Sequence, residues 1–269
     1  MIALANTQMG SGIKEVTIER GKDVRDFTLF VFGGGGPLHA GDLARELNIG
    51  RVIVPPEPGN FSALGMLFAP ARIDEVRTVR VDVEDAYPRL QRLIAEMEEQ
   101  AMGALERDFE NGAITFERQA DMRYKGQRHT IRVPLDSSGD TPALRRRFLD
   151  VYGRRYGRAN PDAPLELVGL RVTAIAVTEA PDLRAFHRAA RNGSGRPQAE
   201  REVYFVGLGG RIRTPVFSRY RLPIGFEMRG PAVVEEFGAT CVIGPHDAFV
   251  VGPFGELRIE VANRATVLQ

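Results

Sequence analysis

The fold is decided by the stretch Phe30–Ala40, which reads Phe-Val-Phe-Gly-Gly-Gly-Gly-Pro-Leu-His-Ala. An apolar run ends in four consecutive glycines, and a proline and a helix-like segment follow at once. Pro37 suits a first helical position because its φ is already helical and its missing N–H would have no partner there. Backbone without Cβ atoms can approach a ligand closely, and the free N–H groups of a helix start favour an anion or a polar ligand edge. The same run is equally compatible with a tight strand-to-helix turn that binds nothing.

The spacing of these glycines excludes two common nucleotide motifs. No Gly-x-x-x-x-Gly-Lys-Ser/Thr occurs in the chain, so a Walker-type phosphate loop is excluded. The dinucleotide fingerprint Gly-x-Gly-x-x-Gly fits poorly. Gly33 and Gly35 could be its first two glycines, but the position of the third glycine is Leu38. Gly34 and Gly36 fail as well, because the third position is then His39.

The segments around the glycine run predict a strand, a helix and a second strand. Phe27–Phe32 and Arg51–Val54 are short apolar runs, and Pro37–Asn48 between them has helical spacing. The chain is also predicted to begin inside an amphipathic helix, because apolar residues recur at helical spacing at Ile2, Ala5, Met9, Ile13 and Val16. Two strands do not make a stable sheet alone, so the rest either comes from later in the chain or is missing. We expect an incomplete sheet here.

Between residues 81 and 180 the apolar spacing alternates between helical and extended. The predicted elements are a helix over Tyr87–Phe109, a hairpin from Ile114–Tyr124 and His129–Leu135, a helix over Pro142–Tyr156 that Thr141 would cap, and a strand over Leu165–Val177. This order indicates an α+β layer with helices on one face of a sheet.

The remaining chain reads as a linker and a β-rich segment. Residues 181–200 carry arginines and Gly/Ser/Pro breakers, and residues 201–269 hold short apolar runs separated by glycine and proline, a spacing typical of a small barrel or sandwich. The predicted domains are therefore residues 1–80, an α/β lobe; 81–180, an α+β domain; 181–200, a linker; and 201–269, an all-β C-terminal domain.

Composition excludes several classes of protein. The 269 residues carry a net charge of +1, which gives no bulk reason to expect nucleic acid or a membrane surface as a partner. The single cysteine cannot form an internal disulfide, which fits a reducing compartment. The chain contains neither a long apolar run nor a leader sequence, so we expect a cytoplasmic protein without a transmembrane helix.

A search for local catalytic motifs is negative. The four histidines are far apart in sequence, and none has a neighbour at metal-ligand spacing, so no metal site is predicted. Cys241 lies in an apolar run, where an inert core thiol is expected. No Gly-x-Ser-x-Gly elbow and no local acid–base pair occur, and the catalytic residues stay unassigned.

Motifs along nearly the whole chain resemble the hydantoinase A / 5-oxoprolinase family. The matching runs are Glu19-Arg20-Gly21, Asp23, Arg25-Asp26-Phe27, Phe32-Gly33-Gly34-Gly35-Gly36-Pro37-Leu38-His39-Ala40, Leu43-Ala44-Arg45-Glu46-Leu47, Val54-Pro55-Pro56, Pro58-Gly59, Ser62-Ala63-Leu64-Gly65, Asp121-Met122-Arg123-Tyr124, Gly126-Gln127, Arg155-Tyr156-Gly157, Gly230-Pro231-Ala232-Val233-Val234-Glu235 and Thr240. Gly35 is a departure, because the family usually has alanine in the third place of the run.

The resemblance implies an actin-like (ribonuclease H-like) ATPase fold, of which residues 1–80 would be the C-terminal part. It also implies ATP and Mg²⁺ as cofactors. The residues expected to bind ATP are Gly33, Gly34, Gly35, Gly36, His39, Gly59 and Ser62. The glycine run would face the adenosine, whereas Gly59 and Ser62 lie in the loop Pro58–Gly65, which would contact the terminal phosphate or the substrate or serve only as a structural turn. The family's N-terminal phosphate motif, an Asp followed by Gly-Gly-Thr, does not occur here. We therefore expect the chain to be a fragment or split-gene product whose missing N-terminal half binds most of the Mg²⁺ and phosphate.

Three functions remain open on the sequence. The first is part of an ATP-dependent hydrolase of cyclic amides, of hydantoin or 5-oxoproline type. The second is a subunit of an ATP-dependent ketone carboxylase on the same scaffold. The third is an inactive fragment that serves only as an interaction module. The partners that the resemblance implies are the missing N-terminal half, a hydantoinase B-type subunit and a small cyclic amide substrate.

Overall fold

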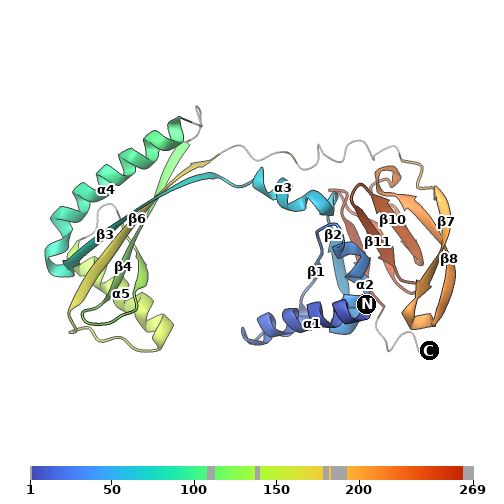
Figure 1. Ribbon diagram of the computed structural model, residues 1–269, viewed down its shortest axis with the longest axis horizontal. Coiled ribbons are helices and arrows are strands. Elements are labelled where there is room, and N and C mark those ends of the chain that lie inside the picture. The colour runs from blue at the N-terminus through green and yellow to red at the C-terminus, as the bar shows by residue number, and fades with distance from the viewer. Residues whose placement is uncertain (1, 108–112, 137–139, 178–181, 183–192, 263–269) are drawn as a thin grey trace. The chain divides into compact units, whose positions relative to one another are not determined.

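The protein divides into two compact units (Figure 1). The computed structural model describes residues 2–107, 113–136, 140–177, 182 and 193–262. Unit 1 comprises Met1–Leu67 and Pro181–Gln269, and unit 2 comprises Phe68–Ala180. Most of the predicted linker, residues 181–200, lies outside the described residues.

The N-terminal segment of unit 1 forms the predicted strand–helix–strand motif. Its elements are α1 (Ile2–Ile18), the 3-10 turn η1 (Val24–Asp26), β1 (Leu29–Phe30), α2 (Gly36–Leu47), β2 (Arg51–Val54), the 3-10 turn η2 (Pro58–Asn60) and α3 (Phe61–Met66). β1 and β2 pair in parallel, with Leu29 opposite Val52. The parallel pairing requires a crossover, and α2 provides it.

The C-terminal segment of unit 1 consists mainly of strands. They are β7 (Ala199–Phe205), β8 (Gly210–Ser218), β9 (Glu227–Arg229), β10 (Ala232–Glu236), β11 (Ala239–Ile243), β12 (Ala248–Val251) and β13 (Leu257–Glu260), with the 3-10 turns η4 (Val206–Leu208) and η5 (Arg219–Arg221). Four of them form a sheet in the order β11-β10-β8-β7.

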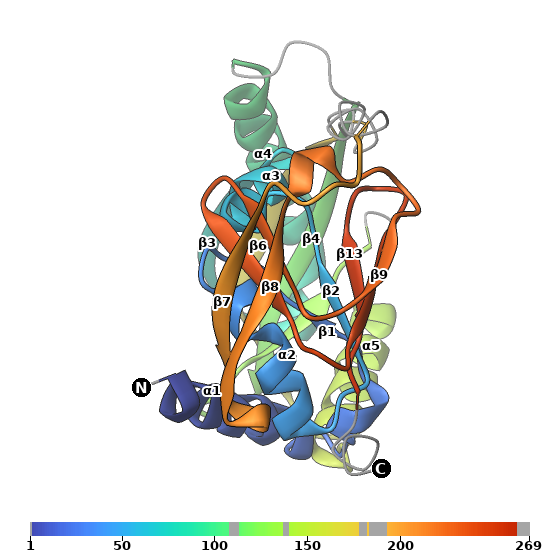
Figure 2. The same ribbon diagram turned by 90° about the vertical axis from the view of Figure 1, so that its right-hand side faces the viewer.

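The other C-terminal strands complete the sheet that begins at the N-terminal segment. Its order is β1-β2-β13-β12-β9, and β13 runs antiparallel to β2 with Arg258 opposite Ile53 (Figure 2). The expected incomplete sheet is therefore wrong: its remaining strands come from later in the chain. The grouping also differs from the expected boundaries, because residues 1–67 and the strands after residue 199 share one unit.

The core of unit 1 lies between α2 and strands of both sheets. α2 contributes Leu43, Ala44 and Leu47, which pack in one cluster with buried strand residues such as Val234 and Ile259. Fully burying an aliphatic side chain of this size stabilises a fold by roughly 1.5–3 kcal/mol. The N- and C-terminal segments thus share one core.

α1 packs against α2 by a different face from the predicted one. Ile2, Met9 and Val16 of the expected apolar stripe are exposed, whereas Asn6 and Gly10 are buried. A Cβ built on Gly10 would lie 3.6 Å from Leu43 Cδ1, so this glycine permits the close approach of the two helices.

Unit 2 is a four-stranded antiparallel sheet with two helices. Its elements are β3 (Ala71–Asp82), α4 (Val83–Glu106), β4 (Ala113–Tyr124), β5 (Ile131–Pro134), α5 (Thr141–Tyr156) and β6 (Leu165–Val177), and the strand order is β3-β6-β4-β5. The predicted hairpin and both helices are present, although α4 begins four residues before the predicted start and the predicted end at Phe109 lies outside the described residues. The helix cap is corrected: the Asp140 carboxylate, rather than Thr141, accepts from the Ala143 N–H at 2.7 Å.

Candidate functional site

The glycine run makes the turn between β1 and α2 in unit 1. Gly33 has a φ of +89°, a conformation that residues with a Cβ rarely adopt. Its N–H donates to the carbonyl of Pro58 at 2.6 Å, and its own carbonyl accepts from the Gly36 N–H at 3.3 Å. Within the described part of the chain, the N–H groups of Gly34 and Gly35 donate to no protein acceptor. Both glycines are exposed, so these two amides are available to a ligand.

Backbone conformation or a close neighbouring atom explains why three of these four positions are glycine. Gly33 needs its positive φ, a Cβ on Gly34 would lie 2.9 Å from the carbonyl oxygen of Gly238, and one on Gly36 would lie 3.0 Å from Val31 Cγ1. A Cβ on Gly35 would meet no described atom within 4 Å, and its φ of −89° is open to any residue. The turn alone therefore does not explain a glycine at position 35.

The loop after β2 lies against the glycine run. A Cβ on Gly59 would be 3.3 Å from the carbonyl oxygen of Gly238 and 3.8 Å from Gly34 Cα. Three backbone segments thus meet where Gly34, Gly59 and Gly238 stand. Ser62 is exposed on the short helix α3, and no described contact joins it to the glycines.

His39 lies in α2 and contacts α1. Its Nδ1 lies 2.7 Å from Oδ1 of Asn6, a buried side chain. An amide oxygen accepts only, so this contact requires the Nδ1 proton and leaves Nε2 as the acceptor of a neutral ring. The structure thus brings Gly33–Gly36 and Gly59 together, and it joins His39 to the α1–α2 packing instead.

Beside this junction lies a polar network that no sequence motif indicated. Its members are the buried side chains of Arg219 and Glu236, the half-buried Glu57 and the exposed Tyr220. Arg219 Nη1 pairs with Glu236 Oε1 at 3.5 Å, and both side chains are almost fully buried. Glu236 Oε2 accepts from the Glu57 N–H at 2.8 Å, and Glu57 Oε1 accepts from the Tyr220 hydroxyl at 2.5 Å. No local motif marks these residues, because Glu57 lies more than 160 positions from its partners.

Burial governs the electrostatics of this group. It raises the pKa of the Glu236 carboxyl, and the neighbouring Arg219 charge opposes that rise. The pKa of Tyr220 is also raised, first by burial and then by its hydrogen bond to Glu57. The arrangement is a hydrogen-bonded charge network, and buried charges of this kind are retained only when paired.

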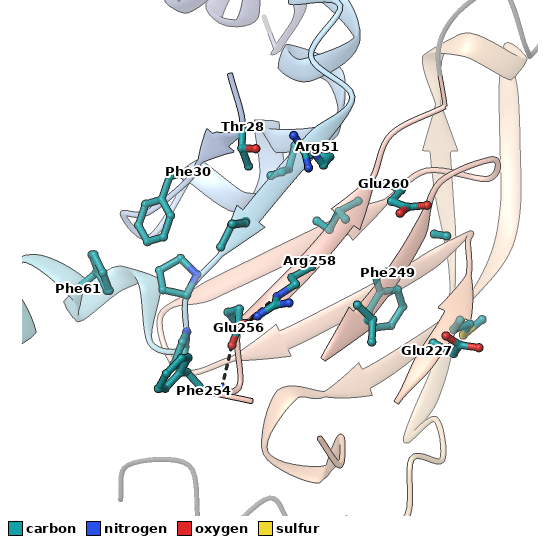
Figure 3. Close-up of a pocket in the computed structure, with 18 of the residues that line it drawn as sticks. Thr28, Phe30, Arg51, Phe61, Glu227, Phe249, Phe254, Glu256, Arg258 and Glu260 are labelled. Atoms are coloured by element: carbon teal, nitrogen blue, oxygen red, sulfur yellow. Dashed lines mark hydrogen bonds and ion pairs between the residues drawn. The ribbon is translucent and has the colours of Figure 1, made fainter. Parts of the chain in front are cut away.

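A large cavity lies on one face of the five-stranded sheet, apart from the glycines. Its volume is about 1150 Å³, and Phe30, Phe61 and Phe254 line it together with charged side chains that include Arg51 and Arg258 (Figure 3). Gly33–Gly36 and Gly59 are not among its lining residues. The cavity and the glycine junction are therefore separate features of unit 1.

Neither the single cysteine nor a group of potential metal ligands forms a second site among the described residues. Cys241 is buried, and desolvation raises the pKa of its thiol to about 12, which disfavours the reactive thiolate form. The described residues contain no cluster of three His, Cys, Asp or Glu side chains that could hold a metal ion. Across the described ranges, no helix is both long and apolar enough to span a membrane.

Comparison with known proteins places these features in a family. Residues 1–75 match the family model described as Hydantoinase/oxoprolinase, and residues 78–254 match the Hydantoinase/oxoprolinase C-terminal domain. Caprolactamase subunit alpha of Pseudomonas jessenii is 29% identical over 91% of this chain and 36% of its own length. 5-Oxoprolinase 1 of Arabidopsis thaliana is also 29% identical, over 97% of this chain and 20% of its own length.

Two solved structures share the mixed α/β fold with its three sheets. The structure of the ATP-dependent caprolactamase from Pseudomonas jessenii matches with a TM-score of 0.66 and 27% identity, over 97% of this chain and 39% of that one. The nucleotide-free structure of acetone carboxylase matches with a TM-score of 0.82, over 96% of this chain and 39% of that one. At 19% sequence identity, this match supports a shared fold and nothing further.

This chain therefore spans between 20% and 39% of the lengths of these relatives. The two family models match it in succession from residue 1 to residue 254. The second model alone covers more than half of the chain, so the chain belongs to the hydantoinase/oxoprolinase family.

Proposed function

We propose that this chain contributes the adenosine side of the nucleotide site in an ATP-dependent hydrolase of cyclic amides. The relatives at 29% identity are named as a caprolactamase subunit and a 5-oxoprolinase, and caprolactam and 5-oxoproline are both cyclic amides. In this proposal the β1–α2–β2 motif is the C-terminal part of an actin-like ATPase lobe, and the glycine run faces the nucleotide.

The observation that carries the proposal is the open space beside Gly35. The other three glycines are explained by φ or by a close neighbour, whereas a Cβ on Gly35 would meet nothing in the described chain. A ligand bound against position 35 would explain the glycine, because a Cβ there would occupy the space of the ligand. The amides of Gly34 and Gly35, which have no protein acceptor among the described residues, would then donate to the polar edge of the adenosine.

The other predicted residues take smaller roles. Gly59 would keep the loop after β2 close to Gly34, and Ser62 would offer its hydroxyl from the exposed start of α3. His39 would act from the α1–α2 contact by fixing the start of α2. None of these residues is proposed to be catalytic.

The residues present fit the adenosine but not the metal. When bound, ATP would supply the phosphoryl group that activates the amide for hydrolysis. The described residues provide no cluster of acidic or histidine ligands for Mg²⁺. We propose that Mg²⁺ and the phosphates are held by the part of the family's length that this chain does not span, and that a hydantoinase B-type subunit joins them.

Two alternatives remain. A role in an ATP-dependent ketone carboxylase is compatible with the fold of acetone carboxylase, but that likeness stands at 19% identity. A purely interacting module would need no ligand at Gly35. The cyclic amide is favoured because the relatives of higher identity act on such rings by name.

ATP hydrolysis tests the proposal. The chain should be assayed alone and together with a polypeptide that supplies the part of the family's sequence that this chain does not span; the two together are called the assembled protein. The substrates to be compared are hydantoins, 5-oxoproline, caprolactam and ketones. We expect cyclic-amide-stimulated ATPase activity from the assembled protein and none above background from this chain alone, because phosphoryl transfer depends on positioned Mg²⁺ and groups around the phosphates. Stimulation by ketones with bicarbonate would support the carboxylase instead, and turnover by the chain alone would contradict the division of the site.

A further inference from the structure

Glu57 has an unusual backbone conformation for its residue type. Its φ and ψ are 50° and 51°, in the left-handed region. Asn48 is the other described residue besides glycine with a positive φ, and asparagine is common there at a helix end. Glu57 also precedes Pro58, and a residue before proline is normally extended. Two independent preferences therefore oppose this conformation.

Two side chains from distant parts of the sequence, one in the turn η5 and one in β10, hold Glu57 in place. Its N–H donates to Glu236 Oε2 at 2.8 Å, and its Oε1 accepts from the Tyr220 hydroxyl at 2.5 Å. The Tyr220 oxygen in turn accepts from the Phe237 N–H at 3.0 Å. Backbone and side chain of Glu57 are thus both held at one point where two chain segments meet.

The partners of Glu57 are themselves fixed. Glu236 pairs with Arg219, whose side chain is 1% exposed. Arg219 Nε donates to the Gly255 carbonyl at 3.0 Å, and its Nη2 donates to the Val54 carbonyl at 3.0 Å. Because Val54 closes β2, the guanidinium anchors Glu236 to the strand that leads into Glu57.

The conformation of Glu57 sets the direction of the next carbonyl group. Pro58 follows it directly, and the Pro58 carbonyl accepts the Gly33 N–H at 2.6 Å. The Asn60 N–H donates back to the Glu57 carbonyl at 2.9 Å and closes the turn. An extended Glu57 would turn the Pro58 carbonyl away from Gly33.

We infer that Glu57 is the positioning residue of the glycine run: held left-handed by Glu236 and Tyr220, it aims the Pro58 carbonyl at the Gly33 N–H. Gly33 anchored in this way fixes the direction of the Gly34 and Gly35 amides that follow it. An effect of Glu57 on ATP affinity rests on the proposed function, whereas its effect on the hydrogen bond between Gly33 and Pro58 does not.

A matched pair of substitutions separates this role from simple packing. Glu57→Ala and Glu57→Gly both remove the carboxylate, but only alanine keeps the Cβ that disfavours the left-handed conformation. That preference is worth roughly a factor of ten in an equilibrium constant. Amide hydrogen exchange at Gly33 in the full chain is the readout, since this N–H makes the anchoring hydrogen bond.

We expect Glu57→Ala to accelerate Gly33 exchange about tenfold and Glu57→Gly to leave it nearly unchanged, because glycine adopts the left-handed region freely. Tyr220→Phe should accelerate exchange in the wild-type background and have no effect when combined with Glu57→Gly. Glu235→Ala is the control, since Glu235 pairs with Arg201 at 3.0 Å and does not contact Glu57. Equal exchange in the alanine and glycine variants would overturn the inference.

ATP affinity of the assembled protein provides the second arm. Glu57→Ala and Tyr220→Phe should each raise the KM for ATP several-fold with little change in kcat, and Glu57→Gly should keep the wild-type KM. If the wild type binds no ATP while Gly33 exchange follows the expected pattern, the proposed function fails and the positioning role stands. If ATP binds but Gly33 exchange does not distinguish alanine from glycine at position 57, the positioning role fails alone.

Discussion

The sheets of the two units differ in how far apart their strands lie in the sequence. The unit 2 sheet uses one continuous segment, from Ala71 to Val177. The five-stranded sheet of unit 1 joins strands within residues 29–54 to strands within residues 227–260. Pairing strands that are farther apart in the sequence costs more conformational entropy, although this cost grows only slowly with their separation.

Buried charged side chains of unit 1 join segments that are far apart in the sequence. In unit 1, Arg45 pairs with the buried Asp247 at 2.8 Å, and Arg219 pairs with the buried Glu236. Unit 2 has pairs that are about half exposed on both sides, such as Arg72–Glu117, and also the largely buried pair Arg123–Glu166, which joins neighbouring strands within one continuous segment. Exposed pairs contribute about 0–1 kcal/mol, whereas breaking a buried one is costly. Buried charges therefore join the distant segments of unit 1.

The largest effect is expected at Asp247. Its carboxylate accepts from Arg45 Nη1 and from the N–H groups of Gly244 and Ala262, both at 3.0 Å. Asp247→Ala should lower the free energy of unfolding by about 3 kcal/mol, because it leaves these donors without their acceptor. Urea unfolding, followed by thiol labelling of the buried Cys241, would report on unit 1 directly.

Asp42 provides the matched control, since its carboxylate accepts from Nη2 of the same Arg45 at 2.9 Å but is about half exposed. Asp42→Ala should cost less than about 1 kcal/mol. Equal losses in the two variants would show that burial does not distinguish the charges of unit 1.

A smaller effect is expected within the glycine run. Gly34→Ala places a Cβ 2.9 Å from the Gly238 carbonyl oxygen and should destabilise unit 1 by about 1–3 kcal/mol. Gly35→Ala meets open space and should be neutral or stabilising by less than about 1 kcal/mol. Thermal unfolding of both variants measures the difference, and an equal loss would mean that Gly35 also serves the turn.

Sequence patterns were sufficient for most of unit 2 because its signals are local. The β4–β5 hairpin, the strand β6 and the helix α5 depend on spacing and turn residues within each segment. Unit 1 was less predictable, since β2 pairs with β13 about 200 residues later and neither strand encodes that choice locally. The apolar spacing of α1 predicted the wrong contact face, because Asn6 and Gly10 face α2 while Ile2, Met9 and Val16 are exposed.

In the candidate site, too, contacts between residues that are distant in the sequence could not be predicted. The glycine run and Gly59, which the structure brings close together, could be selected from the sequence because glycine is itself a signal. Glu57 and Glu236 were not found, because each is an ordinary acidic residue until the fold brings them to 2.8 Å. The position of His39 against Asn6 likewise depends on the packing of α1.

Unit 2 should have a distinct response to acid. The hydrogen bond from Arg123 Nε, at 2.6 Å, lowers the pKa of Glu166 against the opposing effect of burial. A lowered pKa stabilises the folded state above the ordinary value of 4.5, and that contribution is lost as the pH falls through the folded value. Glu166→Gln should therefore weaken the acid dependence of unit 2 unfolding in urea.

Glu117→Gln is the control for that experiment, because Glu117 forms an exposed pair with Arg72 at 2.7 Å. It should leave the acid dependence close to that of the wild type. A wild-type pH profile in the Glu166→Gln variant would show that this carboxyl titrates alike in the folded and unfolded chains.

The measurement that tests the account most directly is ATP binding to Gly35→Val in the assembled protein, by calorimetry. Gly12→Val is the matched control, since Gly12 is also exposed and a Cβ there also meets nothing within 4 Å. We expect Gly35→Val to stay folded and to bind ATP at least about tenfold more weakly, a loss of roughly 1.4 kcal/mol, while Gly12→Val keeps the wild-type affinity. Unchanged ATP affinity in a folded Gly35→Val protein would contradict the account and make the glycine run a turn without a ligand.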